Sequence, residues 1–421
     1  MIVSVKTGSR IPNEHEHGNT NTICEPNEAC VSFSAVCRGQ SMKNGYKAMD
    51  SDMHVIEPCD LWQKYIDKRF SDRAPVGLSR HKRDLGVQVE GKIMPRAPEK
   101  PNPALRPIRE KILNERYPEE EARDFDNVAQ LRAMDKEGLD VAILYPSRGL
   151  FVLAVDGLDP ELAAAIAKAY NDWMSDFCQV APNRMYGAAI VAPHDVSSAV
   201  EETRRIVKEL KFRSILMRPN HVNGRNWSDS YYDPLWAECQ NLDIPVGFHE
   251  AGRVFLPQPA LSQFIPSFTM FNTLSFPMAN MLACADMIYG GVMERFPKLK
   301  VAFLEGNCSW IPWLLWRMGE YAELTGAAEH PELKLEPLEY FQRQCWGAVE
   351  CDEVTAKNLP DFGLEDNIVF STDYPHLDVK YPHAVETFLK LPFSDQTKRK
   401  YLWDNCARLY GLAVDCGEVL S

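Results

Sequence analysis

Short apolar runs alternate with helical segments along most of this chain, and this alternation limits the fold more than any other feature. Eight runs have the length and apolar content of buried strands, at 46–53, 140–145, 186–191, 214–217, 245–248, 300–304, 346–349 and 368–371. Helices are predicted at 126–137, 160–179, 196–210, 231–241, 280–295, 310–323, 353–358 and 382–390. Eight strands with intervening helices favour a closed α/β barrel of the (β/α)8 or TIM type, and a doubly wound open sheet is the alternative.

The remaining segments are assigned from composition. Residues 1–45 are polar and lack periodicity, so a flexible N-terminal extension is expected there. The barrel is predicted over 46–413 and a short tail over 414–421. Two long insertions, 58–125 and 251–279, follow the first and fifth predicted strands. Both would lie over the barrel mouth, and 58–125 is expected to form a lid or a dimerisation arm.

Composition narrows the class of partner. The formal net charge of −13 argues against nucleic acid or an anionic membrane, so a small-molecule substrate is expected. No apolar run reaches the roughly 18 residues of a membrane span, and the first residues lack the apolar core of a signal peptide. The 12 cysteines are scattered without C-x-x-C spacing, so they are expected to be reduced and the protein to be cytoplasmic.

Acidic and imidazole side chains stand at the ends of four predicted strands. Asp52 and His54 close the first run one pleat apart, so their side chains face the same way. His249, Glu305 and Asp373 end three later runs. The C-terminal strand ends of a (β/α)8 barrel meet around one active site, so these residues are predicted to hold a metal ion.

The mixed donor set leaves the metal open. The two imidazoles of His54 and His249 suit Zn, whereas added carboxylates favour Fe or Mn. Five candidate ligands exceed the needs of one tetrahedral ion. One or two divalent ions per chain are therefore expected, with Glu305 or an aspartate as the bridge if there are two.

Three residues are candidates for the chemistry itself. Asp373 is predicted to act as general base as well as ligand. His376 lies three residues later and is predicted to reach the same cavity as a ligand or proton carrier. Arg218 ends the fourth run and is predicted to steady an oxyanion or to clamp a substrate carboxylate.

Other polar residues near the strand ends receive lesser roles. Glu57 is expected to reach back towards the site or to hold one of its ligands. Arg148 is interpreted as a surface salt-bridge residue, with a carboxylate clamp as the alternative. His194 fits a surface turn and a site role equally well. Asp50 is expected to be structural, bonded to backbone or to a neighbouring strand.

Tryptophan recurs at a spacing of three in the predicted helix 310–323. The residues are Trp310, Trp313 and Trp316. This stripe is interpreted as core packing rather than as a binding surface.

Several motifs together carry a resemblance to a known family. They are Asp52-Met-His54, His249, the segment 291–300, Ser371-Thr-Asp-Tyr-Pro-His376 and the segment 402–410. With them, residues 46–413 resemble the amidohydrolase superfamily, in the branch called amidohydrolase family 2. That branch includes aminocarboxymuconate-semialdehyde decarboxylase and aromatic acid decarboxylases. The resemblance implies a TIM barrel with a metal site, in a dimer or larger assembly of like or homologous subunits.

Two positions depart from the family pattern. Many members carry His-x-His or Glu-x-His on the first strand, where this chain has Asp52 before His54. The decarboxylases carry a histidine at the end of the sixth strand, where this chain has Glu305. The carboxylate-rich set is similar instead to members with dinuclear sites, among which thioester hydrolysis and oxygen-dependent N-hydroxylation are known.

These observations favour a metal-dependent hydrolase of a small amide, ester or thioester. The bound ion would lower the pKa of water and create hydroxide in place. The first alternative is a nonoxidative decarboxylase of an aromatic or unsaturated acid. Further alternatives are a dinuclear Fe or Mn oxygenase of the N-hydroxylase kind and a non-catalytic partner subunit.

Overall fold

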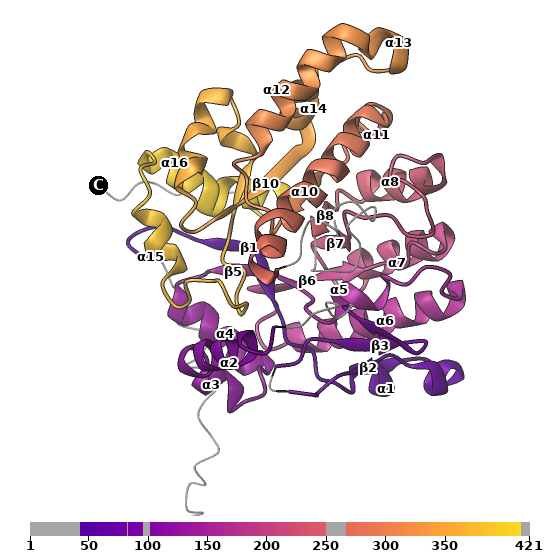
Figure 1. Cartoon of the computed structure of the whole chain (residues 1–421), viewed down its shortest axis with the longest axis vertical. Coiled ribbons are helices and arrows are strands. Elements are labelled where there is room, and N and C mark those ends of the chain that lie inside the picture. The colour runs from indigo at the N-terminus through magenta and orange to yellow at the C-terminus, as the bar shows by residue number, and fades with distance from the viewer. Residues whose placement is uncertain (1–42, 82, 96–101, 250–266, 414–421) are drawn as a thin grey trace, which may run out of the picture. The chain divides into compact units, whose positions relative to one another are not determined.

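The computed structural model describes residues 43–81, 83–95, 102–249 and 267–413 of the chain (Figure 1). Nearly all of the predicted extension 1–45, the tail 414–421 and more than half of the second insertion, 251–279, lie outside the described residues. None of the described helices is both long and apolar enough to cross a membrane.

Eight parallel strands follow one another in chain order around the core, and each overlaps one of the predicted runs. Their bounds are β1 (Met49–His54), β5 (Val141–Tyr145), β6 (Met185–Ile190), β7 (Ser214–Met217), β8 (Val246–His249), β9 (Val301–Leu304), β10 (Cys345–Glu350) and β11 (Ile368–Ser371). The first and last strands meet, because the His54 amide donates to the Tyr374 carbonyl at 2.6 Å. The sheet therefore forms a nearly closed barrel as predicted, and the doubly wound open sheet is excluded.

Apart from β1, which carries polar side chains of the site, the strands are mostly apolar because helices cover the outside and side chains fill the inside. Tyr145 shows how tightly the interior is filled. Its hydroxyl hydrogen-bonds the Ser214 hydroxyl at 2.8 Å. A Cβ on Gly247 would lie only 2.4 Å from the Tyr145 hydroxyl oxygen. Gly247 thus lets the Tyr145 ring lie beside His249, the last residue of β8 (centroids 5.7 Å apart).

Most of the helices that surround the barrel overlap predicted ones, but the helices at 337–344 and 395–399 were not predicted, and one helix begins at 268 instead of 280. The helices are α4 (Asn127–Glu137), α6 (Pro160–Cys178), α7 (Val196–Lys208), α8 (Asp233–Asn241), α10 (Phe268–Tyr289), α11 (Val292–Arg295), α12 (Ile311–Tyr321), α14 (Pro337–Gln344), α15 (Ala384–Leu389), α16 (Asp395–Arg399) and α17 (Asn405–Tyr410). The predicted helix 280–295 is two helices, because Gly291 adopts a φ of 76° between them. The predicted helix 353–358 is a short 3-10 helix, η4 (Val354–Asn358).

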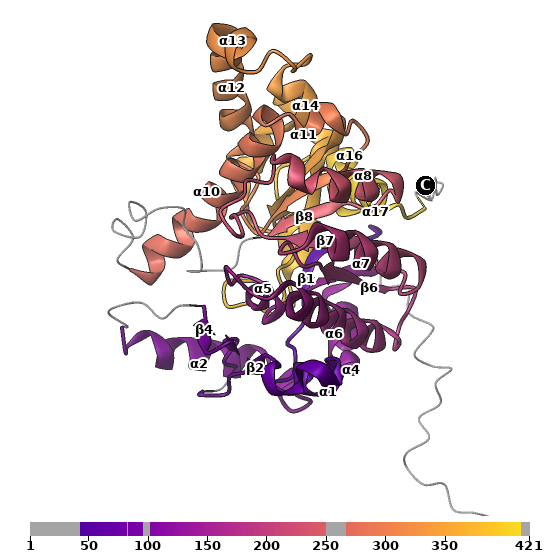
Figure 2. The same ribbon diagram turned by 90° about the vertical axis from the view of Figure 1, so that its right-hand side faces the viewer.

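The insertion 58–125 has structure of its own, which its weak periodicity did not reveal. It contains α1 (Leu61–Tyr65), η1 (Lys68–Arg73), β2 (Val76–Gly77), β3 (Val87–Val89), β4 (Lys92–Met94), α2 (Leu105–Arg116) and α3 (Pro118–Glu121). Strands β2, β3 and β4 form a small antiparallel sheet. Figure 2 shows α1, α2, β2 and β4 together at one end of the barrel.

The predicted core stripe of tryptophans on α12 is wrong for two of its three members. Trp310 is buried, but Trp313 and Trp316 are each 56% exposed. A spacing of three falls short of a full helical turn by about 60° per step, so the stripe winds off the core face. The buried residues of α12 are instead Ile311, Leu315 and Met318, spaced as a helix requires.

Candidate metal centre

The first strand brings Asp52 and His54 to the same pocket. The pairing of β1 with β5 shifts register between Asp50 and Met53, which indicates a bulge at the Asp52 position. Both carboxylate oxygens of Asp52 are buried and lack a hydrogen-bond partner among the described residues. The Oδ1 atom lies 3.6 Å from His54 Nε2. A buried carboxylate without donors is unfavourable unless a cation lies beside it.

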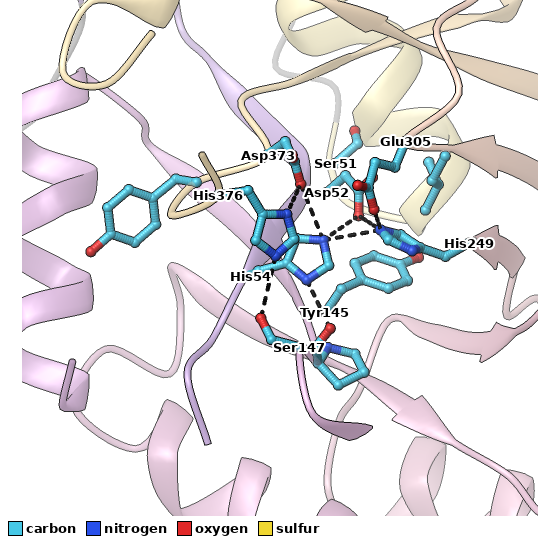
Figure 3. A network of polar contacts seen from close by, with 12 residues as sticks. Ser51, Asp52, His54, Tyr145, Ser147, His249, Glu305, Asp373 and His376 are labelled. Atoms are coloured by element: carbon cyan, nitrogen blue, oxygen red, sulfur yellow. Dashed lines mark hydrogen bonds and ion pairs between the residues drawn. The ribbon is translucent and has the colours of Figure 1, made fainter. Parts of the chain in front are cut away.

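The other predicted ligands converge on the same point (Figure 3). His249 Nε2 lies 3.0 Å from His54 Nε2 and 3.2 Å from Asp52 Oδ1. Glu305 Oε2 lies 3.1 Å from His249 Nε2, and Asp373 Oδ1 lies 3.3 Å from His54 Nε2. The structure therefore brings these side chains from four strand ends together in one cluster.

A hydrogen bond sets the tautomer of His54. Its Nδ1 lies 2.8 Å from the Pro146 carbonyl, which only accepts, so Nδ1 carries the proton and donates it. The Nε2 lone pair then faces the cluster, as in histidines that bind metals. Burial lowers the pKa of His54 well below its ordinary value, and the nearby rings of His376 and His249 add to this effect. A neutral imidazole is the form that ligates.

Glu305 and Asp373 both adopt backbone conformations that non-glycine residues avoid. Their φ angles are 43° and 53°. Such strain costs about 1–3 kcal/mol for each residue and gathers at functional sites. Glu305 directly follows β9, and Asp373 follows β11 by one residue, so the strained turns aim both carboxylates inwards.

The carboxylates of Glu305 and Asp373 lie close together in the cluster, and their pKa values are raised. Burial raises the pKa of Asp373 well above its ordinary value, and the carboxylates of Asp378 and Asp52 raise it further. Burial likewise raises the pKa of Glu305, with added repulsion from Asp373 and Asp52. A divalent cation would reverse both shifts, because it favours the ionised carboxylates.

The donors present fit such a cation. Two groups of residues offer ligand atoms, and within each group these atoms all lie within 4.8 Å of one another. One group is formed by Asp52, His54 and His249, and the other by His54, Glu305, Asp373 and His376. Imidazole with carboxylate is a donor set suited to Zn, Fe or Mn. The two groups share His54, so the donor set is compatible with one ion or with two.

His376 extends the cluster towards a serine that the sequence analysis missed. Its Nδ1 lies 2.7 Å from Asp373 Oδ1, and its Nε2 lies 3.5 Å from the Ser147 hydroxyl (Figure 3). Burial lowers the pKa of His376 to about 4. Ser147 is the second residue after β5, directly after Pro146. The rule that polar side chains after parallel strands gather at one site would therefore also have pointed to Ser147.

Glu57 and Arg148 hold the loop that carries Ser147. The Glu57 carboxylate accepts from the amides of Ser147, Arg148 and Gly149 at 2.8–3.2 Å. Arg148 is 4% exposed and donates to backbone carbonyls, so its interpretation as a surface salt-bridge residue is wrong. Its guanidinium is directed at carbonyl oxygens, because the loop that carries it turns inwards after β5.

Two further candidates have defined surroundings. Arg218 is buried and donates to Asn220 Oδ1 and to the Leu150 carbonyl, close to the loop of Ser147. His194 is buried against the Val155 carbonyl and is absent from both groups of ligand atoms among the described residues.

Asp50 has the structural role expected of it. The carboxylate accepts from the backbone amides of Asp52 and Thr372 and from the Thr372 hydroxyl. These bonds join the first strand to the residue after the last one.

Comparison with known proteins agrees with this architecture. Residues 49–412 match the model of a family described as amidohydrolase. The chain is 26% identical over 302 residues to 2-amino-3-carboxymuconate-6-semialdehyde decarboxylase of Dictyostelium discoideum, covering 68% of this chain and 77% of that protein. It is also 26% identical over 292 residues to gamma-resorcylate decarboxylase of Polaromonas sp. strain JS666, covering 67% and 86%.

Solved structures share the fold. An amidohydrolase from Mycobacterium avium subsp. paratuberculosis K-10 superposes with a TM-score of 0.68 at 24% identity, over 88% of this chain and all of the other. A 5-carboxyvanillate decarboxylase from Novosphingobium aromaticivorans, solved with bound manganese, gives a TM-score of 0.61 at 20% identity, over 87% and 98%. Since the family match spans most of the sequence, this chain belongs to the amidohydrolase family.

Proposed function

We propose that this chain is a metal-dependent, nonoxidative decarboxylase of an aromatic or unsaturated carboxylic acid. The observation that carries the proposal is the buried cluster of imidazoles and carboxylates at the C-terminal strand ends. The family assignment supports it, because the curated relatives named above are decarboxylases. Hydrolysis, which the sequence placed first, has less support from these relatives than decarboxylation.

Asp52, His54, His249 and Asp373 would hold the ion, and Glu305 would complete or bridge its ligand set. The bound manganese in the related 5-carboxyvanillate decarboxylase makes Mn²⁺ the first ion to test. When bound, a divalent cation supplies positive charge that holds substrate oxygens and stabilises charge developing in the transition state. The carboxylates of the site alone would repel an anionic substrate.

Residues of the cluster are placed to transfer the proton that decarboxylation requires. The bond between the carboxyl carbon and the neighbouring carbon of the substrate breaks, and CO2 leaves. The electron pair stays on that neighbouring carbon, which then takes up a proton. Asp373, which lies 2.7 Å from His376 Nδ1, is the group proposed to deliver that proton. His376 bonds Asp373 and lies beside the Ser147 hydroxyl, so it is placed to return a proton to Asp373.

One observation favours hydrolysis as a second candidate. Glu305 occupies the end of β9, where the related decarboxylases are expected to carry a histidine. A carboxylate there can bridge two ions, which an imidazole cannot do in the same way. A dinuclear site would suit attack by water on an amide, ester or thioester.

The test is a paired assay of Mn²⁺-loaded and Zn²⁺-loaded protein, with metal counted by elemental analysis. Hydroxybenzoic and unsaturated dicarboxylic acids are screened for CO2 release, and acyl thioesters, esters and amides are screened for cleavage, with and without dioxygen. CO2 release that needs the metal and not dioxygen supports the proposal. Thioester, ester or amide cleavage without CO2 release from any acid would replace it with hydrolysis, and strict dependence on dioxygen would point to an oxygenase.

A further inference from the structure

The first insertion is joined to the loop that carries Asp373 and His376. Three side chains of the insertion donate to three successive carbonyls of that loop. The bonds run from Arg83 Nη2 to Pro375 at 2.7 Å, from the Tyr117 hydroxyl to His376 at 3.2 Å, and from Arg116 Nη1 to Leu377 at 2.7 Å. Hydrogen bonds donated by a guanidinium are about twice as strong as neutral ones.

Aromatic packing strengthens the same contact. The buried Tyr117 ring lies edge-on to Tyr374, with centroids 5.6 Å apart, and stacks on Tyr381 at 5.4 Å. The Arg83 guanidinium lies over the rings of Tyr117 and Phe125 at 5.0 and 4.7 Å. Both ends of the loop after β11 are therefore fixed by side chains from the insertion.

The loop on the other side of His376 is tied to the insertion as well. Arg148, which follows Ser147, donates through Nη1 to the carbonyls of Leu78 and Gly86 at 3.0 and 2.7 Å. Leu78 and Gly86 lie in the insertion, on either side of the turn that contains Arg83. The insertion thus contacts both loops that place polar groups on the His376 ring.

The loop after β11 needs such support. Asp373 has a φ of 53°, which is unfavourable for a residue with a side chain. Its own turn is closed by one backbone bond, from the His376 amide to the Asp373 carbonyl at 3.0 Å. A strained conformation persists only where the surroundings determine it.

We propose that Arg83, Arg116 and Tyr117 are positioning residues, and that the described part of the insertion 58–125 is a fixed platform holding the Asp373–His376 pair against the metal cluster. The three side chains act through backbone carbonyls and do not touch the reacting groups. The catalytic meaning of this inference rests on the proposed function, but the positional claim does not.

The test uses full-length protein loaded with Mn²⁺ and the variants Arg116→Ala and Tyr117→Phe. The second keeps the ring contacts and removes only the hydroxyl. Arg116→Lys is the rescue variant. Arg106→Ala is the matched control, because Arg106 lies on the same helix and bonds only the exposed Glu110 side chain in the described part of the chain.

Two readouts do not depend on activity. Hydrogen exchange of a peptide covering 373–381 should become about tenfold faster in Arg116→Ala, the scale of one charge-assisted hydrogen bond, with less change elsewhere. Release of Mn²⁺ to a chelator should accelerate, because Asp373 is held less firmly. Tyr117→Phe should show the same changes more weakly, whereas Arg116→Lys and Arg106→Ala should resemble the wild type.

Kinetics adds the functional readout. With any substrate that the wild type converts, kcat should fall several-fold more than KM rises, since binding through the metal is retained. Unchanged local exchange and unchanged Mn²⁺ release in both Arg116→Ala and Tyr117→Phe would overturn the inference. Changed exchange in a protein that releases no CO2 from any acid would uphold the platform and reject only the decarboxylase assignment.

Discussion

At the scale of single residues, Asp52 is the strongest sign of a cation. Its side chain is fully buried, accepts no hydrogen bond from the part of the chain that the structure describes, and lies 3.2 Å from His249 Nε2. The sequence predicted this residue because alternation in a strand places it on the same face as His54. It missed Ser147, which also follows a strand, because only acidic, imidazole and guanidinium side chains were considered at the strand ends.

Removal of any of the core ligands should remove most of the metal. We expect Asp52→Ala, His54→Ala and His249→Ala each to lose the ion, because the remaining donors are left undercoordinated and buried. Elemental analysis of the purified proteins gives the metal content. His194→Ala is the control, a buried histidine near another strand end that should keep full metal. Full metal in all three ligand variants would show that the site lies elsewhere.

Asp373 and Glu305 should separate in their effects. Asp373→Asn keeps the shape but cannot carry the proton, so kcat should fall about a hundredfold or more. Glu305→Gln should lower the metal content from two ions towards one if Glu305 bridges, and Glu305→His should favour a single ion. Steady-state rates and metal counts measure both effects. A Glu305→Gln protein with wild-type metal and rate would place Glu305 outside the site.

At the scale of elements, buried carboxylates hold the loops that bear the site. Glu353 accepts from the amides of Cys308 and Ser309 at 2.8–3.2 Å and from the Ser309 hydroxyl, just beyond the strained Glu305. Sequence patterns predicted the barrel strands because most of them are short apolar runs between helical segments. They missed β2, β3 and β4, since elements of two or three residues are too short to show a period.

Loss of the Glu353 carboxylate should loosen the loop after β9. Glu353→Ala leaves several buried amides without an acceptor, which costs about 2–4 kcal/mol of stability and should lower the apparent Tm by about 5 °C or more. Glu353→Gln keeps an acceptor and should lose less. Thermal melts followed by circular dichroism give the comparison, and equal melting of Glu353→Ala and wild type would contradict the role.

At the scale of the whole barrel, the candidate ligands come from β1, β8 and the turns after β9 and β11. An ion held by all of them links elements far apart in sequence, so binding should stabilise the folded state. The sequence predicted this gathering from the rule that parallel strand ends meet. It could not predict how the insertion packs, because long-range contacts by single arginines leave no pattern in the chain.

Metal removal should therefore lower thermal stability. Treatment with a chelator is expected to reduce the apparent Tm, and added Mn²⁺ should restore it in proportion to its excess over the Kd. The His54→Ala variant serves as control, because it should melt at one temperature with or without chelator. A wild-type protein whose Tm ignores both treatments would argue against a structural contribution from the ion.

The barrel closes where its first strand, β1, meets its last strand, β11, and this has a consequence for biosynthesis. Asp52 and His54 leave the ribosome early, whereas Asp373 emerges more than 300 residues later. Translation proceeds at about 5–20 residues per second, so tens of seconds separate the two halves of the ligand set. During that interval the nascent chain carries an open sheet edge and an incomplete site. The ligand set proposed for the ion would thus be complete only late in synthesis, after Asp373 has emerged.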